Sequence, residues 1–185
     1  MSESYAVPDG DPFGWDLAHH YGVPIFGTAG CSDAKVFDAQ AAAEAALTLF
    51  ANAVSGANLI HDVGYLDCAM TGPLEFVVFC NEMVGWLRRY LRKLDISEET
   101  LALDLIHEVG PDGHFLETEH TLRYVCQDWR PTVSDRFAYH PWAAEGATTL
   151  QQRANQAARE VIGSHRAAPL PEDAVKRIDA IINDH

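Results

Sequence analysis

Residues 21–91 of the chain read YGVPIFGTAGCSDAKVFDAQAAAEAALTLFANAVSGANLIHDVGYLDCAMTGPLEFVVFCNEMVGWLRRYL. Two short apolar runs, Val23–Gly27 and Asn58–Gly64, each lead into a polar turn that contains glycine, and a stretch with helical apolar spacing follows each turn. Such runs, alternating with helical segments, predict buried parallel strands in β-α units. Because α/β proteins keep their chemistry where parallel strands end, this stretch also predicts where a site would lie.

The rest of the pattern predicts helices. Alanine-rich spacing up to Val54, followed by Gly56 at the C′ position, predicts a helix with one face packed closely on a neighbour. Ser97 and Thr149 are predicted N-caps. The expected helices cover about 34–54, 73–91, 97–110, a short stretch from about 119, 149–164, and a last one from 171.

Composition limits the class of protein. The 185 residues are enough for one domain with a core, and 48% hydrophobic with 22% charged residues is an ordinary globular composition. Residues 1–16 carry Pro8, Gly10, Pro12 and Gly14 and are predicted to be a loose arm before a domain at 17–185. The net charge of −14 argues against nucleic acid or an anionic membrane as a partner and favours a cationic ligand.

The cysteines and the apolar stretches indicate a location. Four cysteines stand far apart with no C-x-x-C pair, which predicts free thiols in a reducing compartment. No secretory signal opens the chain, and the longest apolar stretch, 76–86, is interrupted by Asn81 and Glu82. We therefore expect a soluble, cytoplasmic protein.

Three segments resemble a known family. They are GTAGCSDAKVFDAQ at 27–40, SGANLIHDVGYLD at 55–67 and EVGPDGHFLETEHTLR at 108–123. In them the chain resembles the trimethylamine methyltransferase family, whose members transfer a methyl group from a methylated amine to a corrinoid protein. The resemblance runs from about Leu17 to Ile182 and concerns the C-terminal part of that enzyme.

The resemblance implies a fold and a partner. The expected fold is helix-dominated α/β, namely the C-terminal part of a (β/α)8 TIM-type barrel with about two parallel strands, plus C-terminal helices. A complete barrel needs about 250 residues, so most of the barrel is not in this chain. The family implies a corrinoid (cobalamin) carried by a separate protein and no cofactor bound directly by this chain. Trimethylamine enzymes proper carry pyrrolysine; this chain has only standard residues, which favours quaternary-amine relatives.

The strand ends supply the candidate site. Methyl transfer from an ammonium centre needs a dry cage of aromatic faces and perhaps a carboxylate, with little acid–base work. At the two strand ends the expected catalytic residues are His61 and Asp62, and the expected substrate-binding residues are Phe26, Thr28, Asp33 and Tyr65. No metal ligands are expected.

Structural readings of the same residues stay open. Phe26 could be core packing, His61 and Asp62 a structural hydrogen-bonded pair, and Asp33 a helix cap in competition with Ser32. Gln40 and Glu44, one turn apart, are expected to contact the strands and not substrate, and Glu75 is expected to be a helix cap.

Two other signals are rejected. His107 is one residue too far from Asp104 for the Asp-x-His-x-x-Gly corrinoid motif and lies in a predicted helix, whereas that motif's histidine sits in a loop. His114 and His120 are six residues apart, which is not the spacing of a zinc helix.

Two functions therefore remain. The first is methyl transfer from a methylated amine, such as trimethylamine or glycine betaine, to the Co(I) of a corrinoid protein. The second is a catalytically incomplete fragment that acts as an assembly or interaction piece, or as half of a split enzyme. Two strands without flanking neighbours leave apolar surface exposed, so we expect a homo-oligomer or an N-terminal half on another chain.

Overall fold

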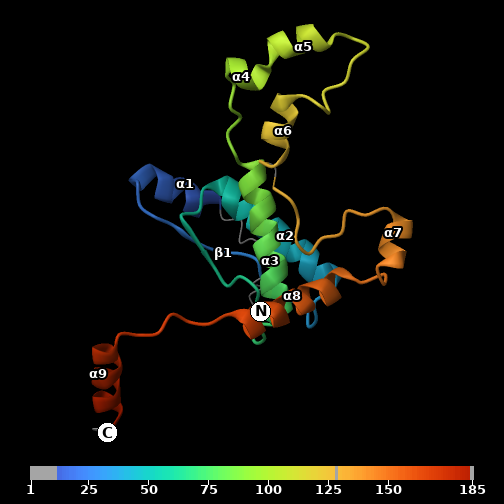
Figure 1. Ribbon diagram of the computed structural model, residues 1–185. Helices are drawn as coiled ribbons and strands as arrows, with labels where there is room; N and C mark the ends of the chain where they lie inside the picture. Colours follow the sequence, from blue (N-terminus) through green and yellow to red (C-terminus); the bar gives the residue numbers. More distant parts are fainter. Residues whose placement is uncertain (1–11, 128, 184–185) are drawn as a thin grey trace.

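The computed structural model describes residues 12–127 and 129–183. Two strands and three long helices form its body, and shorter helices surround it (Figure 1). In chain order the elements are α1 (Pro12–Tyr21), β1 (Phe26–Thr28), α2 (Ala39–Ser55), β2 (Leu59–His61), α3 (Leu74–Tyr90), α4 (Glu98–Leu101), α5 (Leu103–Val109), α6 (Glu119–Val125), α7 (Tyr139–Ala144), α8 (Leu150–Ser164) and α9 (Glu172–Asn183).

The two strands pair in parallel, as predicted. The register aligns Phe26 with Leu59 and Thr28 with His61. Side chains alternate across a strand, so these four residues share one face of the sheet. That face is open: Phe26 is 64% and Leu59 53% exposed, whereas Gly27 and Ile60, on the other face, are buried or packed against the core.

The covered face requires glycine at position 27. A Cβ there would overlap the side-chain oxygen of Asn52 on α2 and crowd the ring of Trp15 on α1. Asn52 Nδ2 in turn donates a hydrogen bond to the backbone oxygen of Thr28 (3.2 Å). The close approach of backbone and helix therefore fixes α2 against β1.

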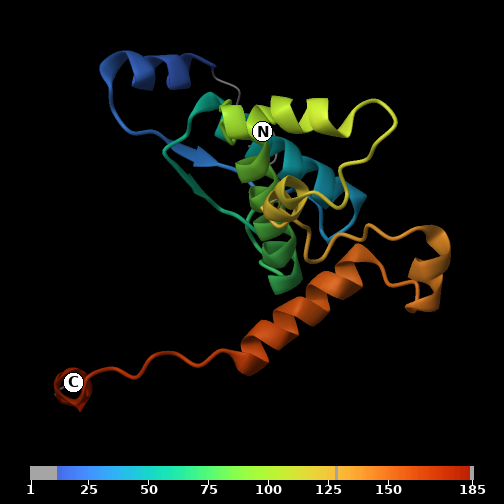
Figure 2. The same ribbon diagram turned by 45° about the horizontal axis from the view of Figure 1, so that its top comes forward.

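The core lies between α2, α3 and α8. Ala41 and Ala45 of α2 are fully buried, which confirms that the alanine face packs closely on neighbours. Phe76 of α3 is fully buried as well, and Ala154 of α8 completes the cluster. Small residues let the helix axes approach, so that α2 packs on β1, α3 packs on α2, and α8 packs on α3 (Figures 1 and 2).

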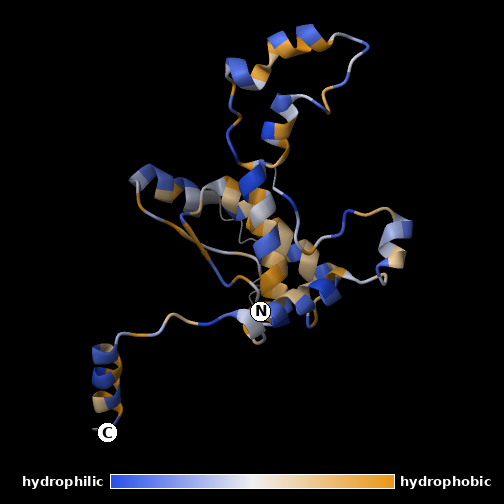
Figure 3. Ribbon diagram, in the orientation of Figure 1, coloured by the Kyte–Doolittle hydropathy of each residue, from blue (hydrophilic) through white to orange (hydrophobic). Residues whose placement is uncertain are grey.

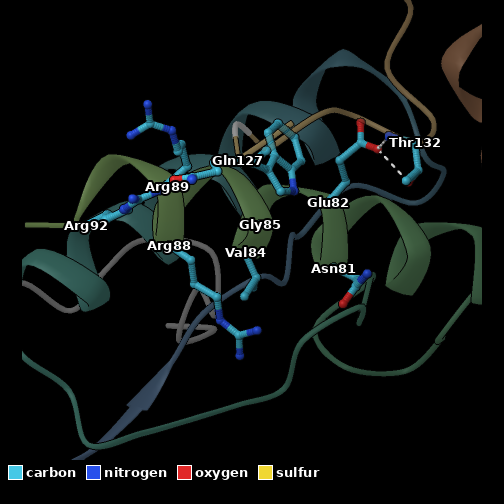
Figure 4. Close-up of a pocket in the computed structure, with 10 residues that line it drawn as sticks. Asn81, Glu82, Val84, Gly85, Arg88, Arg89, Arg92, Gln127 and Thr132 are labelled. Atoms are coloured by element: carbon cyan, nitrogen blue, oxygen red, sulfur yellow. Dashed lines mark hydrogen bonds between the residues drawn. The ribbon is translucent and has the colours of Figure 1, made fainter. Parts of the chain in front are cut away.

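Glu82 fastens the segment 129–136 to α3. Its buried carboxylate accepts hydrogen bonds from the backbone N–H groups of Thr132 (2.6 Å), Val133 (2.6 Å) and Ser134 (2.7 Å) and from Thr132 Oγ1 (2.9 Å). Figure 4 shows the side chain pointing toward Thr132. Burial alone would raise the pKa of Glu82, but these hydrogen bonds outweigh it and hold the pKa below its ordinary value.

Several predicted boundaries were wrong. Residues 12–16, expected in a loose arm, belong to α1; residues 1–11 lie outside the described residues. The first long helix begins at Ala39 and not near 34, because Asp38 is its N-cap and accepts a hydrogen bond from Ala41 N (3.1 Å). Neither Asp33 nor Ser32 caps it. The α3 helix begins one residue later than expected, since Pro73 is the N-cap residue and not N1.

The later helices match the predicted caps better than the predicted lengths. Ser97 and Thr149 both form capping boxes, and Gly56 closes α2 with φ 82°. The helix expected over 97–110 is broken at Ala102, whose φ of 48° is left-handed, and α7 was not expected. No helix in the described part of the chain is long and apolar enough to cross a membrane.

Two parts project from the body. The helices α4, α5 and α6 form a lobe beyond the end of α3, and α9 stands at the end of an extended segment, 165–171 (Figures 1 and 2). Hydrophobic residues lie along one side of α9 although it stands apart from the body (Figure 3).

Candidate functional site

The turns that follow the two strands are joined by backbone hydrogen bonds. These bonds continue the parallel pairing beyond the strands, so the two turns form one surface at the carboxyl ends of the sheet. They run from Ala29 N to His61 O (3.2 Å), Gly64 N to Gly30 O (2.8 Å), Ser32 N to Tyr65 O (3.0 Å) and Asp67 N to Ala34 O (3.0 Å).

Four predicted site residues meet on the open face of the sheet. His61 Nδ1 lies 2.9 Å from Asp62 Oδ2, and His61 Nε2 lies 3.5 Å from Thr28 Oγ1. The ring of Phe26 contacts the imidazole, with centroids 5.6 Å apart and planes tilted by 59°. We call Phe26, Thr28, His61 and Asp62 the strand-end cluster. The carboxylate holds the imidazole in one orientation, and that contact also agrees with the structural reading of the pair.

The backbone changes direction directly after β2. Asp62 has φ 65°, a left-handed conformation that few residues other than glycine adopt. Its carboxylate can therefore turn back onto the preceding His61, while the chain continues into the next turn. Three further consecutive residues, Asp67, Cys68 and Ala69, are also left-handed. Local backbone strain of this kind collects at functional sites.

Asp33 and Tyr65 lie further along the turns, beside the strand-end cluster and not within it. Asp33 Oδ1 accepts a hydrogen bond from Cys68 Sγ (3.4 Å), and Lys35 Nζ pairs with Asp67 Oδ1 (2.8 Å). The ring of Tyr65 is 41% exposed beside Gly72. The ion pair and the thiol contact hold the two turns together, and neither was predicted from the sequence.

Glu44 of α2 supports the first turn from below. One of its carboxylate oxygens accepts hydrogen bonds from Ser32 Oγ (2.5 Å) and from Asp33 N (3.2 Å), and the other accepts one from Gln40 Nε2 (2.9 Å). This confirms the predicted contact between helix and strand ends for Glu44, whereas Gln40 is exposed and its hydrogen bond goes to Glu44 of the same helix. The i, i+4 spacing was the signal for it.

The thiols around the strand ends are not activated nucleophiles. None of the four cysteines forms a disulfide, as predicted. Burial, and then the nearby Asp62 carboxylate, raise the pKa of Cys31 to about 11, and burial raises that of Cys80 to about 12. The hydrogen bond to Asp33 raises the pKa of Cys68. Each is therefore a neutral thiol at pH 7, and a thiol is a weak nucleophile and metal ligand.

The chemical capacity of the site is that of a cation-binding surface. An aromatic face, an oriented imidazole and a carboxylate stand together, and they suit a ligand with a positive, poorly hydrated centre. His61 is 48% exposed at its side chain and Asp62 27%, so the surface is open. In the described residues no group of three or more His, Cys, Asp or Glu side chains is arranged to hold a metal ion.

Comparison with known sequences gives consistent matches. A family model described as trimethylamine methyltransferase (MTTB) matches residues 14–185. The chain is 34% identical over 167 residues to trimethylamine methyltransferase MttB of Methanosarcina barkeri (strain Fusaro), a match that covers 90% of this chain and 34% of that protein. It is 34% identical over 168 residues to the glycine betaine methyltransferase of Desulfitobacterium hafniense (strain Y51), covering 90% and 35%. The chain thus spans about a third of the length of the curated relatives it matches.

Proposed function

The chain belongs to the trimethylamine methyltransferase family, and on that premise we propose that it supplies part of a methyl-transfer site. The donor is a methylated amine such as trimethylamine or glycine betaine. The acceptor is the Co(I) of a corrinoid carried by a partner protein. The fold we propose for the complete enzyme is a (β/α)8 barrel, with β1 and β2 as two of its strands.

One observation carries this proposal: the strand-end cluster lies on the face of the sheet opposite α2. In a β/α barrel the helices form the outer ring, so the face without helices is the interior. Phe26, Thr28 and His61 would then point into the barrel near its carboxyl-terminal mouth, where barrel enzymes place their chemistry. In a complete barrel the other strands would cover this face. Without them, its side chains are expected to be exposed, as Phe26 and His61 are here.

The reaction asks little proton transfer of these residues. The methyl carbon leaves the amine nitrogen and bonds to cobalt; the cobalt electron pair makes the new bond, and the electrons of the C–N bond stay on the departing amine. A quaternary donor leaves as a neutral tertiary amine, so no proton has to move. The Phe26 ring and the Asp62 carboxylate can stabilise the cationic donor, and His61, held by Asp62 at 2.9 Å, can fix its orientation.

Which class of methylated amine donates the methyl group is supported less directly than the reaction itself. Relatives are named for a tertiary amine and for a quaternary one. Over the third of the relatives' length that this chain spans, the sequence carries only standard residues, which supports testing the quaternary donor first. We therefore propose glycine betaine or a similar quaternary amine as the first substrate to test.

A second function fits the exposed sheet. Phe26 and Leu59 are more than half exposed on its open face, and in the described residues each strand pairs only with the other. Open sheet edges and apolar faces promote association. The chain would then act as an assembly piece, or as one half of a split enzyme whose other half supplies the remaining strands.

Methylcobalamin formation distinguishes the two. The assay follows absorbance while the chain is incubated with glycine betaine or trimethylamine and reduced cobalamin, with and without a polypeptide equivalent to the first two thirds of the relatives. We expect no turnover from the chain alone and turnover from the combination, which Tyr65→Ala should lower. Turnover by the isolated chain would contradict the need for further strands; no turnover from a stable combined assembly would favour the assembly role.

A further inference from the structure

The α9 helix carries an apolar face that the body of the protein does not cover. Val175, Ile178, Ile181 and Ile182 recur at helical spacing along one side and are 41–66% exposed. The helix stands apart from the body in both views (Figures 1 and 2). Four β-branched side chains in water on a twelve-residue helix are a feature of a docking segment and not of a free one.

An aromatic groove lies beside the last turns of α3. It has a volume of about 510 Å³. Phe50 contacts Tyr90 with ring centroids 5.7 Å apart, and Trp86 meets Trp129 edge-on at 5.9 Å. Tyr90 is 70% exposed and Trp86 41%. Arg136 lies over the ring of Trp86, 4.9 Å from its centre, so the groove is apolar within and basic at its rim.

Charge favours an acidic helix as the occupant of this groove. Two of the residues that line the groove, Arg89 and Arg136, are basic, in a chain of net charge −14. On α9, Glu172 and Asp179 are seven residues apart and so border one side of the apolar face, while Arg177 borders the other side. An apolar face with an acidic border matches an apolar groove with a basic rim.

The connecting segment directs α9 away from its own groove. Segment 165–171 leaves α8 near the beginning of α3, whereas the groove lies at the end of α3 (Figures 1 and 2). Seven residues span at most about 25 Å, which is the whole length of the 17-residue α3 at about 1.5 Å per residue. Docking within one chain would require this segment to reverse and run taut along the body. Docking on a second chain requires neither.

We propose that α9 of one copy docks into the aromatic groove of a second copy, with Ile178 and its apolar neighbours against Trp86, Tyr90 and Trp129. Exchange in both directions gives a dimer. The interface is distinct from the strand-end cluster, and the inference does not depend on the reaction that the site performs.

Sedimentation equilibrium of the full chain tests this through matched variants. Ile178→Asp places a charge in the apolar face, whereas Ala180→Asp places the same charge on the opposite side of α9. Wild type and Ala180→Asp should dimerise with similar constants in the micromolar range, and Ile178→Asp should weaken association at least about 30-fold. Tyr90→Asp, at an exposed groove position, should do the same.

A mixture makes the test specific. Ile178→Asp keeps an intact groove and Tyr90→Asp keeps an intact α9, so mixing them should restore one helix-in-groove contact and recover part of the dimer. A wild-type chain that stays monomeric through the micromolar range would overturn the proposal. So would dimers that Ile178→Asp and Tyr90→Asp leave unchanged, or association that requires the polypeptide supplying the remaining strands.

Discussion

Replacing Glu82 with glutamine should weaken the body of the protein more than any other loss of a single charge. The Glu82 carboxylate is 3% exposed and accepts four hydrogen bonds, three at one oxygen and one at the other. Glutamine keeps one acceptor oxygen but turns an NH₂ group toward a backbone N–H. One donor is then left without an acceptor, and the remaining bonds become neutral.

The magnitude follows from those contacts. Leaving the Ser134 N–H unsatisfied costs about 1–3 kcal/mol, and each bond that loses its charged partner weakens by several tenths to 1 kcal/mol. We expect the free energy of unfolding to fall by about 3 kcal/mol in Glu82→Gln. Glu82→Ala, which leaves all donors unpaired and a cavity, should cost about 4–5 kcal/mol.

Urea unfolding followed by circular dichroism measures the change. Glu75→Gln, in the first turn of the same helix, is the matched control and should cost less than about 1 kcal/mol. The pH dependence of the free energy of unfolding provides a second test. The pKa of Glu82 is lower in the folded state than in the unfolded state, where it is about 4.3, so its stabilisation is present above that pH and is lost as the pH falls through the folded value. Glu82→Gln should lack this part of the acid-induced loss.

An equal stability of Glu82→Gln and wild type at pH 7, within about 0.5 kcal/mol, would refute the reasoning. It would mean that the segment 129–136 is held to α3 by other contacts and that the carboxylate is not its anchor.

Three further predictions concern Gly27 in β1, the N-cap of α2 and the buried thiol of Cys31. Gly27→Ala should destabilise the protein by at least about 2 kcal/mol, because the new methyl group overlaps Asn52; unchanged thermal unfolding would contradict this. Asp38→Ala should cost about 1 kcal/mol as a lost N-cap, measured by urea unfolding; no loss of stability would mean that the cap does not hold α2. Cys31, buried and with its pKa raised to about 11, should react with iodoacetamide at pH 8 far more slowly than exposed Cys126, by mass spectrometry of timed samples; equal rates would show that the turns open readily.

The predictable part of the fold is the part that local sequence determines. Ser97, Thr149 and Gly56 act on backbone groups within four residues, so their roles were visible in the sequence. The break at Ala102 carries no signal, because alanine favours a continuous helix. The Pro- and Gly-containing opening of the chain predicted an arm, whereas residues 12–21 form α1.

The start of α2 depended on contacts distant in sequence. Ser32 N donates to Tyr65 O and Ala34 O accepts from Asp67 N, which holds residues 32–34 in the turn and postpones the helix to Asp38. No helical periodicity can show a constraint that comes from thirty residues away.

The candidate site was also predictable only in part. That Thr28 and His61 would be neighbours follows from parallel register at the strand ends, and the structure has them at 3.5 Å. Asp33 and Tyr65 were expected in the same group but lie beside it. The left-handed Asp62 redirects the second turn; aspartate adopts this conformation more readily than most residues, but the sequence does not mark Asp62 among the other aspartates for it.

The central claim is tested most directly by comparing two combined enzymes, each made of this chain and the polypeptide that supplies the remaining strands. One carries the native Asp62 and the other carries Asp62→Asn, and the rate of methyl transfer is measured for both. The matched control is Asp112→Asn, an exposed carboxylate in the turn after α5. If the strand-end cluster orients the methyl donor, Asp62→Asn should lower kcat/KM for methylcobalamin formation by about 10- to 100-fold, because it removes the charge beside the donor and weakens the contact that orients the imidazole of His61. Asp112→Asn should leave the rate unchanged. An Asp62→Asn enzyme that folds, assembles and turns over at the native rate would contradict the assignment of the site.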